Sequence, residues 1–328
     1  MKIRCISCGR DRKGNELFCE CGSPFEIIPD FKYYDDINRN FPYIKRFISL
    51  GEVETPVIKK HNFSMKLDYF SPTFSYKDRG SRTLISYVND LKINEINEDS
   101  SGNAGASIAG YGAAAGIKVK IFVPENASAA KLSQIMSYGA QVIKIKGSRD
   151  DVQRAAQASD GFYASHILRP EFRDGIRTLA YEIFNQGMPD HIYVPVSAGT
   201  LLLGLYSGLK HLYESSEIKT MPKIIGVQPE NISPVCSRLN NIKYDPDNNL
   251  TSIADALVSK RPVLIERMLE ALYKCISVSE DEIKIARDEL AASGIYVEYS
   301  SATVYAAYKK VRLDNSMLIL TGNGLKNQ

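Results

Sequence analysis

Hydrophobic and polar residues alternate along this chain in two different periods. From residue 81 onward, short apolar runs follow segments in which apolar residues recur about every 3.6 positions, the period of a helix. Strands are predicted at residues 119–124, 141–145, 191–196, 223–227 and 317–321. Helices are predicted at residues 81–91, 107–115, 128–137, 150–158, 175–185, 201–213, 280–292 and 302–310. This alternation predicts an α/β fold in which parallel sheets are covered by helices on both faces.

The size and composition of the chain narrow the class of protein. Its 328 residues are 44% hydrophobic and 24% charged, which is typical of a globular protein with room for two domains. The net charge of +3 is spread without a long basic run, so it favours neither a nucleic-acid nor a membrane partner. The longest apolar stretch, residues 194–209, is shorter than the roughly 20 residues of a membrane span. Because no secretory leader opens the chain, we expect a cytoplasmic protein.

Four of the six cysteines form two close pairs near the start of the chain. Cys5 pairs with Cys8 and Cys19 with Cys21, and a glycine follows each pair. Glycine accepts the left-handed backbone that lets N–H groups point at thiolate sulfurs, as in four-cysteine zinc ribbons. We therefore expect these residues to bind a structural Zn2+ ion, which would stabilise a segment too short to fold on an apolar core.

Alternatives to zinc remain open for this cysteine cluster. A single residue separates Cys19 from Cys21, whereas a spacing of two is commoner, so reduced structural thiols or a chance cluster are possible. Disulfides are a poor alternative in a chain without a secretion signal. The other two cysteines, Cys236 and Cys275, are isolated and are expected to be buried apolar residues.

A lysine close to a loop of small residues gives the first sign of chemistry. Lys77 stands in the run Ser71-Pro-Thr-Phe-Ser-Tyr-Lys-Asp-Arg-Gly80, and the loop Ser100-Ser-Gly-Asn-Ala-Gly-Ala-Ser107 follows after one helix and one strand. An amine near a loop that can bind anions suggests Schiff-base chemistry. Taken singly, Lys77 would be an exposed lysine and the loop an ordinary helix cap.

Two further segments of small residues follow predicted strands. The strand at 191–196 leads into Ser197-Ala-Gly-Thr-Leu201 and a helix, an arrangement in which backbone N–H groups can bind phosphate. The last strand leads into Leu320-Thr-Gly-Asn-Gly-Leu-Lys326. Each segment alone also fits simple packing of a helix on a sheet or a glycine-rich strand end.

Together these segments resemble the pyridoxal-phosphate (PLP) enzymes of the tryptophan-synthase-β class, or fold type II, and most closely the threonine synthases. The matching segments include the run around Lys77, the loop at residues 100–107, a Glu-Tyr-Ser-Ser-Ala segment from Glu298 and the ending from Thr321. Many threonine synthases also carry an N-terminal cysteine segment. The resemblance implies two three-layer α/β domains, a cofactor cleft between them and a zinc-ribbon-like segment.

The resemblance also implies a role for individual residues. Lys77 would be the catalytic residue, carry the cofactor and move the Cα proton of the substrate. Asn103 would bind the phenolic oxygen of the cofactor and Thr321 its ring nitrogen. The cofactor phosphate would be bound by Ser197, Ala198, Gly199, Thr200 and Leu201. The carboxylate of the amino-acid substrate would be bound by Ser100, Ser101, Gly102 and Ala104.

The domain boundaries and the assembly follow from the same resemblance. Residues 1–30 would form the zinc-ribbon-like segment, residues 31–80 and 160–328 the larger PLP-binding domain, and residues 81–159 the smaller α/β domain. A homodimer is the usual arrangement of the family and is expected here.

The chain departs from the threonine synthases in three places. Residues 165–178 replace a Glu-Gly-Gln-Lys-Thr run and Phe74 stands where the family has glycine, so substrate specificity is expected to differ at these two places. Ser197 also stands where the family has glycine, which leaves open which groups bind the cofactor phosphate. A phosphate-bearing substrate also needs its own anion site. Candidates are Arg79, Lys131, Arg169, Arg173 and Arg177. Each of these is more readily explained as a surface or ion-paired cation. An arginine, with its planar bidentate fork, would suit phosphate better than a lysine.

The leading hypothesis is a PLP-dependent threonine synthase that converts O-phosphohomoserine and water to threonine and phosphate. A second hypothesis keeps the cofactor and changes the leaving group, as in serine/threonine ammonia-lyases and cysteine or cysteate synthases. A third is a non-catalytic protein whose zinc ribbon binds a partner.

Overall fold

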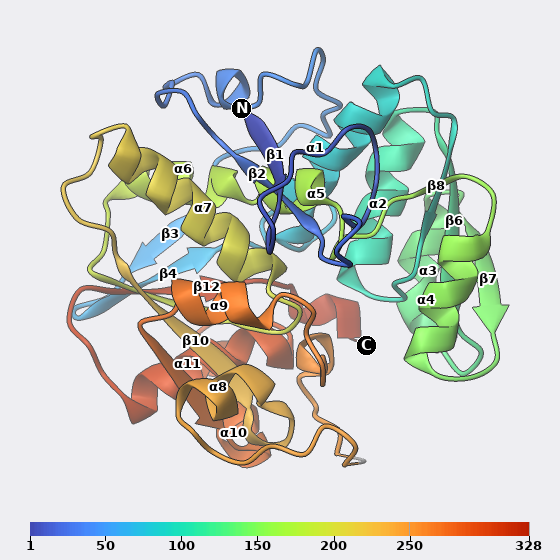
Figure 1. Cartoon of the computed structure of the whole chain (residues 1–328). Helices are drawn as coiled ribbons and strands as arrows, with labels where there is room; N and C mark the ends of the chain where they lie inside the picture. The colour runs from blue at the N-terminus through green and yellow to red at the C-terminus, as the bar shows by residue number, and fades with distance from the viewer. Residues whose placement is uncertain (249, 328) are drawn as a thin grey trace. The chain divides into compact units, whose positions relative to one another are not determined.

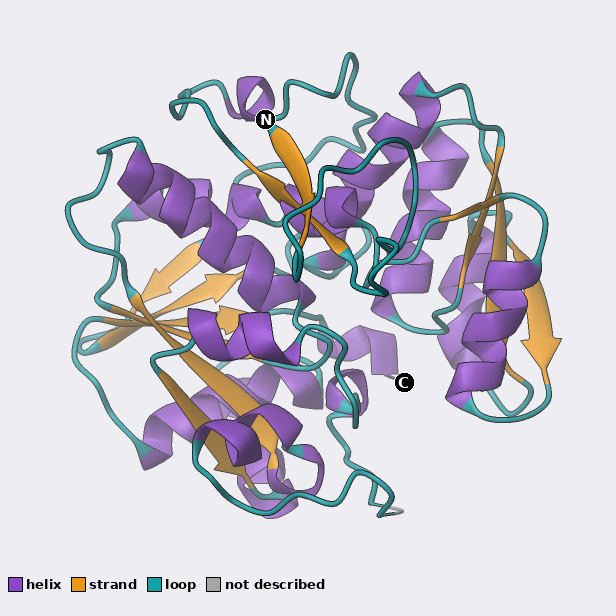
Figure 2. Cartoon of the chain, in the orientation of Figure 1, coloured by secondary structure: helices purple, strands orange, loops and turns teal. Residues whose placement is uncertain are grey.

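The computed structural model describes residues 1–248 and 250–327, without the side chains of residues 130, 131 and 327. The chain forms two compact units (Figures 1 and 2). Unit 1 comprises Met1–Glu52, Lys77–Thr178 and His211–Glu217, and unit 2 comprises Val53–Tyr76, Leu179–Lys210 and Ile218–Gln328. Among the described residues, no helix is both long and apolar enough to cross a membrane.

Unit 1 contains a parallel four-stranded sheet in the order β7–β6–β5–β8 (Figure 1). The strands are β5 (Glu95–Glu98), β6 (Lys118–Pro124), β7 (Gln141–Ile145) and β8 (Phe162–Tyr163), connected by α2 (Asn103–Ala114), α3 (Ala129–Ser137) and α4 (Arg149–Ala158). The three consecutive apolar residues Ile121, Phe122 and Val123 are buried, as expected of a parallel strand covered on both faces. Right-handed crossovers place α2 and α3 on one face and α4 on the other.

Two glycines bring α1 (Lys77–Asp90) against α5 (Pro170–Gly175) within unit 1. A Cβ on Gly80 would lie 2.4 Å from the ring of Phe172, and a Cβ on Gly175 would lie 2.3 Å from the carbonyl oxygen of Arg79. The two helices can approach this closely only because neither glycine carries a side chain. The start of α1 therefore lies against the segment at residues 165–178.

The N-terminal segment of unit 1 is an antiparallel hairpin of β1 (Lys2–Cys5) and β2 (Phe25–Ile28). Its small core contains the buried residues Cys5, Cys19 and Phe25. The hairpin is fixed to α5, because the guanidinium of Arg173 donates to the carbonyl of Phe25 and the buried side chain of Arg12 pairs with Glu171.

Unit 2 contains a six-stranded sheet in the order β11–β10–β9–β12–β4–β3. The strands are β3 (Val57–Lys59), β4 (Phe63–Leu67), β9 (His191–Pro195), β10 (Lys223–Pro229), β11 (Lys274–Val278) and β12 (Ser316–Leu320). Only the edge strand β3 runs antiparallel to its neighbour. Because β12 pairs in parallel with both β4 and β9, the carboxyl ends of these three strands meet at one edge, where ligands bind in open α/β sheets.

Helices cover both faces of this sheet. They are α8 (Pro234–Leu239), α9 (Ile265–Ala271), α10 (Glu280–Ala292), α11 (Tyr299–Lys310), and parts of α6 (Arg177–Gln186) and α7 (Thr200–Glu214). Short 3-10 helices are η1 (Ile37–Asn40) in unit 1 and η2 (Glu230–Ile232), η3 (Asp255–Leu257) and η4 (Gly324–Asn327) in unit 2.

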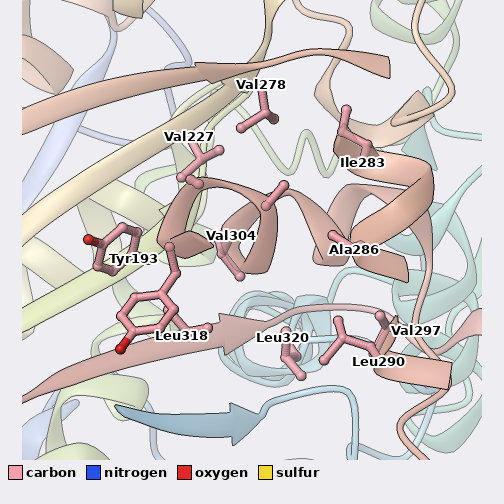
Figure 3. Packing of buried hydrophobic residues seen from close by; sticks show 14 of the residues in the cluster. Tyr193, Val227, Val278, Ile283, Ala286, Leu290, Val297, Val304, Leu318 and Leu320 are labelled. Carbon is pink, nitrogen blue, oxygen red and sulfur yellow. The ribbon is translucent and has the colours of Figure 1, made fainter. Parts of the chain in front are cut away.

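The main core of unit 2 lies between the sheet and helices α10 and α11 (Figure 3). Tyr193, Val227 and Leu318 project from the strands toward Val304 of α11, and Ile283 of α10 joins them. All five residues are fully buried. This packing holds the first turn of α11 near the end of β12, where the candidate site begins.

The predicted α/β alternation is confirmed, but several helices begin earlier than predicted. Helix α1 begins at Lys77 instead of residue 81, α2 at Asn103 instead of 107, and α11 at Tyr299 instead of 302. The first turns of these helices consist largely of polar and small residues, which carry no apolar period. The predicted helix at 175–185 is wrong in its boundaries, because α5 ends at Gly175 and α6 begins at Arg177.

The expected domain ranges and the compact units divide the chain differently. Residues 31–52, 77–80, 160–178 and 211–217, which were expected in the larger domain, fold in unit 1. Contacts such as the ion pair of Arg12 with Glu171 explain this, because they join the N-terminal residues to α5.

The expectation that Cys236 and Cys275 are isolated buried residues is wrong in one respect. Both are buried, but they form a disulfide between α8 and β11, with their Cα atoms 4.8 Å apart. Their separation of 39 residues hides this pairing in the sequence.

Candidate active site

Lys77 is the first residue of α1, and the chain just before it is fixed in unit 2. The N–H of Tyr76 donates to the carbonyl of Thr321 (3.0 Å), and Ser75 forms a β-bridge with Gly322. The predicted cofactor lysine is therefore the next residue after a segment anchored at the carboxyl end of β12.

Contacts around Lys77 within unit 1 join α1 to α2. The hydroxyl of Ser107 lies 2.6 Å from Asp78 Oδ1 and 2.7 Å from Ser81 Oγ, and all three residues are buried. The ammonium of Lys77 lies 5.8 Å from the centre of the Phe172 ring. The lysine and the loop at residues 100–107, which are distant in sequence, thus belong to one part of unit 1.

The loop at residues 100–107 connects β5 to α2. Gly102 precedes the first helical residue, which is Asn103. A Cβ on Gly105 would lie 1.9 Å from the carbonyl oxygen of Ser100, so glycine is required for the loop to pass this close to the helix. The positive end of α2 suits a carboxylate.

A cluster of ionisable side chains, which sequence reasoning missed, stands directly before this loop. Glu98 and Asp99 are buried, and Nδ1 of His166 lies 2.5 Å from Glu98 Oε1. Arg149 is 2.6 Å from Asp99 Oδ2, and the hydroxyl of Tyr163 donates to Asp99 Oδ1 (2.7 Å). The available sequence signal was the pair of adjacent acidic residues, Glu98 and Asp99, just before the loop.

The surroundings shift the pKa values of the central pair in opposite directions. Burial, reinforced by the neighbouring Asp99, raises the pKa of Glu98 well above its usual range, although the charges of Arg149 and Lys77 act the other way. Burial, followed by the charges of Lys77 and Arg149, holds the pKa of His166 well below its usual range. Both shifts favour an uncharged carboxyl group hydrogen-bonded to an uncharged imidazole.

In unit 2, the turn from β9 to α7 holds the predicted phosphate-binding residues. Gly199 has a positive φ of 93°, and α7 begins at the next residue, the buried Thr200. A Cβ on Gly199 would also lie 2.6 Å from Met268 Sδ. The backbone N–H groups at the start of this 15-residue helix lack acceptors within the helix, so the turn can bind a phosphate group.

Thr321, the predicted partner of the ring nitrogen, follows β12 and bonds to Ser301 of α11. Their hydroxyl oxygens are 2.9 Å apart. Ser301 Oγ also accepts from the N–H groups of Thr321 (2.9 Å) and Gly322 (2.8 Å). With its lone pairs used in this way, Ser301 donates its own proton to the carbonyl of Gly322 (3.2 Å) or to Thr321, and in either case the Thr321 hydroxyl can donate to a ligand.

An unsatisfied polar atom in unit 2 provides a test of whether a cofactor fits here. Ser75 is fully buried, and its hydroxyl has no hydrogen-bond partner among the described residues. A buried hydroxyl without a partner costs free energy, so a polar ligand beside it would be stabilising. Together with the β9–α7 turn and Thr321, this supports the fit of a phosphorylated pyridine cofactor.

Phe74, which stands where the threonine synthases have glycine, has a left-handed backbone with φ 68°. Its carbonyl accepts from Asn323 N–H (3.2 Å), and its side chain is 53% exposed. Only glycine adopts this conformation without strain, which explains why glycine would be suitable at this position.

Three of the arginines considered for a substrate phosphate have structural partners instead. Arg169 donates to the carbonyls of Tyr163 and Asn15, and Arg173 to those of Ile167 and Phe25. Arg177 pairs with Asp174 and donates to the carbonyl of Asn40. Arg79 donates to Thr178 Oγ1 (3.1 Å), and the side chain of Lys131 lies outside the described part of the chain.

The four N-terminal cysteines come together within unit 1. Their sulfur atoms all lie within 4.8 Å of one another, with Cys5 and Cys21 at 3.4 Å and Cys8 and Cys19 at 3.6 Å. Four sulfurs at about 2.3 Å from a tetrahedral zinc ion would lie about 3.8 Å apart. The following residues, Gly9 and Gly22, both have positive φ, as the sequence pattern predicts. The donor set and its spacing therefore fit a tetrahedral metal ion.

Unit 1 thus offers a lysine at a helix start, and unit 2 offers a strand-to-helix turn and a hydroxyl at the carboxyl edge of a mainly parallel sheet. Residues 48–322 match the family described as pyridoxal-phosphate dependent enzymes, and the chain belongs to this family. A curated threonine synthase of Methanocaldococcus jannaschii is 31% identical, over 100% of this chain and 93% of the relative. A threonine synthase of Methanosarcina acetivorans is 26% identical, over 99% and 92%.

Solved structures agree with this fold. The crystal structure of a pyridoxal 5'-phosphate-dependent aspartate racemase superposes with a TM-score of 0.74 at 23% identity, covering 90% of this chain and 97% of the racemase. Likeness at this level of identity shows the fold alone. The fold type II assignment is therefore confirmed.

Proposed function

We propose that this protein is a PLP-dependent threonine synthase, which converts O-phosphohomoserine and water to threonine and phosphate. The observation that carries the proposal is the match to threonine synthases over nearly the full length of both chains. The candidate site supports it, because it offers separate places for the amine, the carboxylate and the cofactor phosphate.

We assign the following roles to the residues of unit 2. The N–H groups of Ser197, Ala198, Gly199, Thr200 and Leu201 bind the cofactor phosphate, and Thr321 donates to the ring nitrogen. When bound, PLP supplies an electron-withdrawing ring that acidifies the substrate C–H bond next to the amine. A neutral hydroxyl partner moderates this effect, since it does not keep the ring nitrogen protonated.

In unit 1, Lys77 would hold the cofactor through its side-chain amine, and the same amine would move the Cα proton of the substrate. Asn103 binds the phenolic oxygen of the cofactor. Ser100, Ser101, Gly102 and Ala104 bind the substrate carboxylate at the start of α2, where the helix end favours a negative charge.

The direct test is turnover of O-phosphohomoserine by the purified protein loaded with PLP. We expect equal amounts of threonine and phosphate. Serine, threonine and phosphoserine serve as competing substrates. If the loaded protein instead forms a keto acid and ammonia, or needs sulfide or sulfite, the proposed substrate is wrong and the cofactor class stands.

We further propose that Cys5, Cys8, Cys19 and Cys21 bind a structural Zn2+ ion. The sulfur separations and the two left-handed glycines support a tetrahedral thiolate site. Metal analysis of protein purified without chelators should give one zinc per chain, and Cys8→Ser should lower this content.

The resemblance to threonine synthases motivates two further proposals, a homodimer and a cytoplasmic location. Light scattering on the purified protein should give twice the mass of the 36.5 kDa chain. Fractionation of the native cell should recover the protein with the cytoplasmic enzymes.

A further inference from the structure

The cluster of Glu98, Asp99, Arg149, Tyr163 and His166 is not used by any role assigned above. It lies at the carboxyl end of β5, directly before the loop that binds the substrate carboxylate. Lys77 is close enough for its charge to influence both Glu98 and His166, and the ring of Phe172 contacts both Lys77 (5.8 Å) and His166 (6.0 Å between ring centres). The cluster therefore adjoins the reacting amine within unit 1.

We propose that His166 and Arg149 bind the distal phosphate of the substrate, with Glu98 and Asp99 as the positioning residues that orient them. The inference rests on the proposed function. It assigns the second anion site that a phosphate-bearing substrate requires, for which Arg169, Arg173 and Arg177 are already committed to structural contacts.

The hydrogen bond to Glu98 determines which imidazole nitrogen of His166 carries the proton. A protonated Glu98 carboxyl donates to Nδ1 of the imidazole, which leaves the proton of the neutral ring on Nε2. Nε2 has no protein partner among the described residues, and 12% of the side chain is exposed. His166 is then an N–H donor that can bind a phosphate oxygen without carrying a charge.

Arg149 supplies the positive charge of the proposed site. Asp99 accepts a hydrogen bond from the hydroxyl of Tyr163 at Oδ1 and pairs with the guanidinium of Arg149 at Oδ2. Because 49% of the Arg149 side chain is exposed, its other N–H groups remain accessible to a phosphate.

The same carboxylates could be mistaken for a cation site, since the ligand atoms of Glu98, Asp99 and His166 lie within 4.8 Å of one another. The charges argue against a cation. Asp99 is already paired with Arg149, the positive charge of Lys77 acts on the same groups, and burial favours the uncharged form of Glu98. The expected ligand is an anion.

The test measures KM for O-phosphohomoserine and competitive inhibition by inorganic phosphate, using enzyme loaded with PLP. His166→Ala and Arg149→Gln should each raise both constants about tenfold or more, as expected for loss of a hydrogen bond to a charged group. The visible absorbance of the bound cofactor should not change. Arg154→Gln is the matched control, because Arg154 is an exposed arginine of the same helix, and it should leave both constants unchanged.

Two variants of Glu98 test the protonation state. Glu98→Gln retains a donor to Nδ1 and should keep KM within about threefold, whereas Glu98→Ala should resemble His166→Ala. In 15N NMR spectra of histidine-labelled protein, the resonance that His166→Ala removes should show a proton on Nε2 and should shift when inorganic phosphate is added.

An unchanged affinity for phosphate in both His166→Ala and Arg149→Gln would overturn the inference, as would a proton on Nδ1 instead of Nε2. These outcomes are distinct from failure of the proposed function. If the proposed function is wrong, the unmodified enzyme will not turn over O-phosphohomoserine. The NMR measurement of phosphate binding would still show whether the anion site exists.

Discussion

Each unit has one strand-to-helix turn that can offer backbone N–H groups to an anion. The two turns differ in the residues that precede them. The β9–α7 turn of unit 2 follows apolar residues and relies on Gly199 with its positive φ. The β5–α2 turn of unit 1 follows the buried acids Glu98 and Asp99, each held by another ionisable side chain. A turn made of backbone groups suits a permanent cofactor phosphate, whereas a turn backed by titratable side chains suits a substrate that changes during reaction.

The largest effect is expected from Lys77→Ala. Loss of the amine should reduce phosphate release from O-phosphohomoserine at least about a thousandfold, because the same group holds the cofactor and moves the proton. The β9–α7 turn should still bind PLP, but without the visible absorbance of the lysine-bound form. Retention of a few per cent of the activity would contradict the role of Lys77.

A substitution in the unit 2 turn should affect the cofactor and spare the substrate. Gly199→Ala introduces a Cβ at φ 93° and 2.6 Å from Met268 Sδ, so the affinity for PLP should fall about tenfold or more. Ser197→Ala is the matched control and should change the affinity less than about threefold, since the turn binds through its backbone. If both variants lost the same affinity for PLP, the Ser197 side chain would take part in binding. The proposed difference between a backbone turn in unit 2 and a turn next to ionisable side chains in unit 1 would then be wrong.

Metal removal should affect unit 1. The cysteine hairpin is joined to α5 through Arg173 and Phe25, and α5 contains Phe172 beside Lys77. Treatment with a chelator, or Cys8→Ser, should lower the apparent Tm by about 10 °C and raise KM for the substrate, while PLP stays bound. An unchanged Tm after the metal has been shown to leave would contradict a structural role.

The smallest effect is expected at Phe74. Phe74→Gly should relieve the left-handed backbone and stabilise the protein by up to about 1 kcal/mol, partly offset by the flexibility of glycine in the unfolded chain. Phe70→Gly, at another exposed phenylalanine nearby without positive φ, should destabilise. Denaturant unfolding of both variants checks the sign, and destabilisation by Phe74→Gly would show that its ring contributes more than the strain costs.

The sequence alone predicted the parts of the site that are contiguous in the chain. Lys77, the loop at residues 100–107 and the turn at 197–201 each lie in a short run whose residue types indicate Schiff-base or anion-binding chemistry. The Cys5 to Cys21 cluster was predictable for the same reason, because two close pairs with glycine have few other uses.

Contacts between distant residues could not be predicted from the sequence. The pair of Glu98 and His166 depends on the parallel pairing of β5 with β8, and the disulfide of Cys236 with Cys275 on the packing of α8 beside β11. In the sequence Arg169, Arg173 and Arg177 were candidates for a substrate phosphate or for ion pairs, and only the fold identifies their carbonyl and carboxylate partners. The first turns of α1 and α2 were missed because their small polar residues carry no apolar period.

The central claim is that Lys77 holds the cofactor, and it is tested most directly by chemical trapping. Borohydride reduction of the PLP-loaded protein, followed by digestion and mass spectrometry, should find the pyridoxyl group on the peptide that contains Lys77. The addition should disappear in Lys77→Ala. A pyridoxyl group on a different lysine, or none on a protein whose spectrum shows bound PLP, would contradict the account.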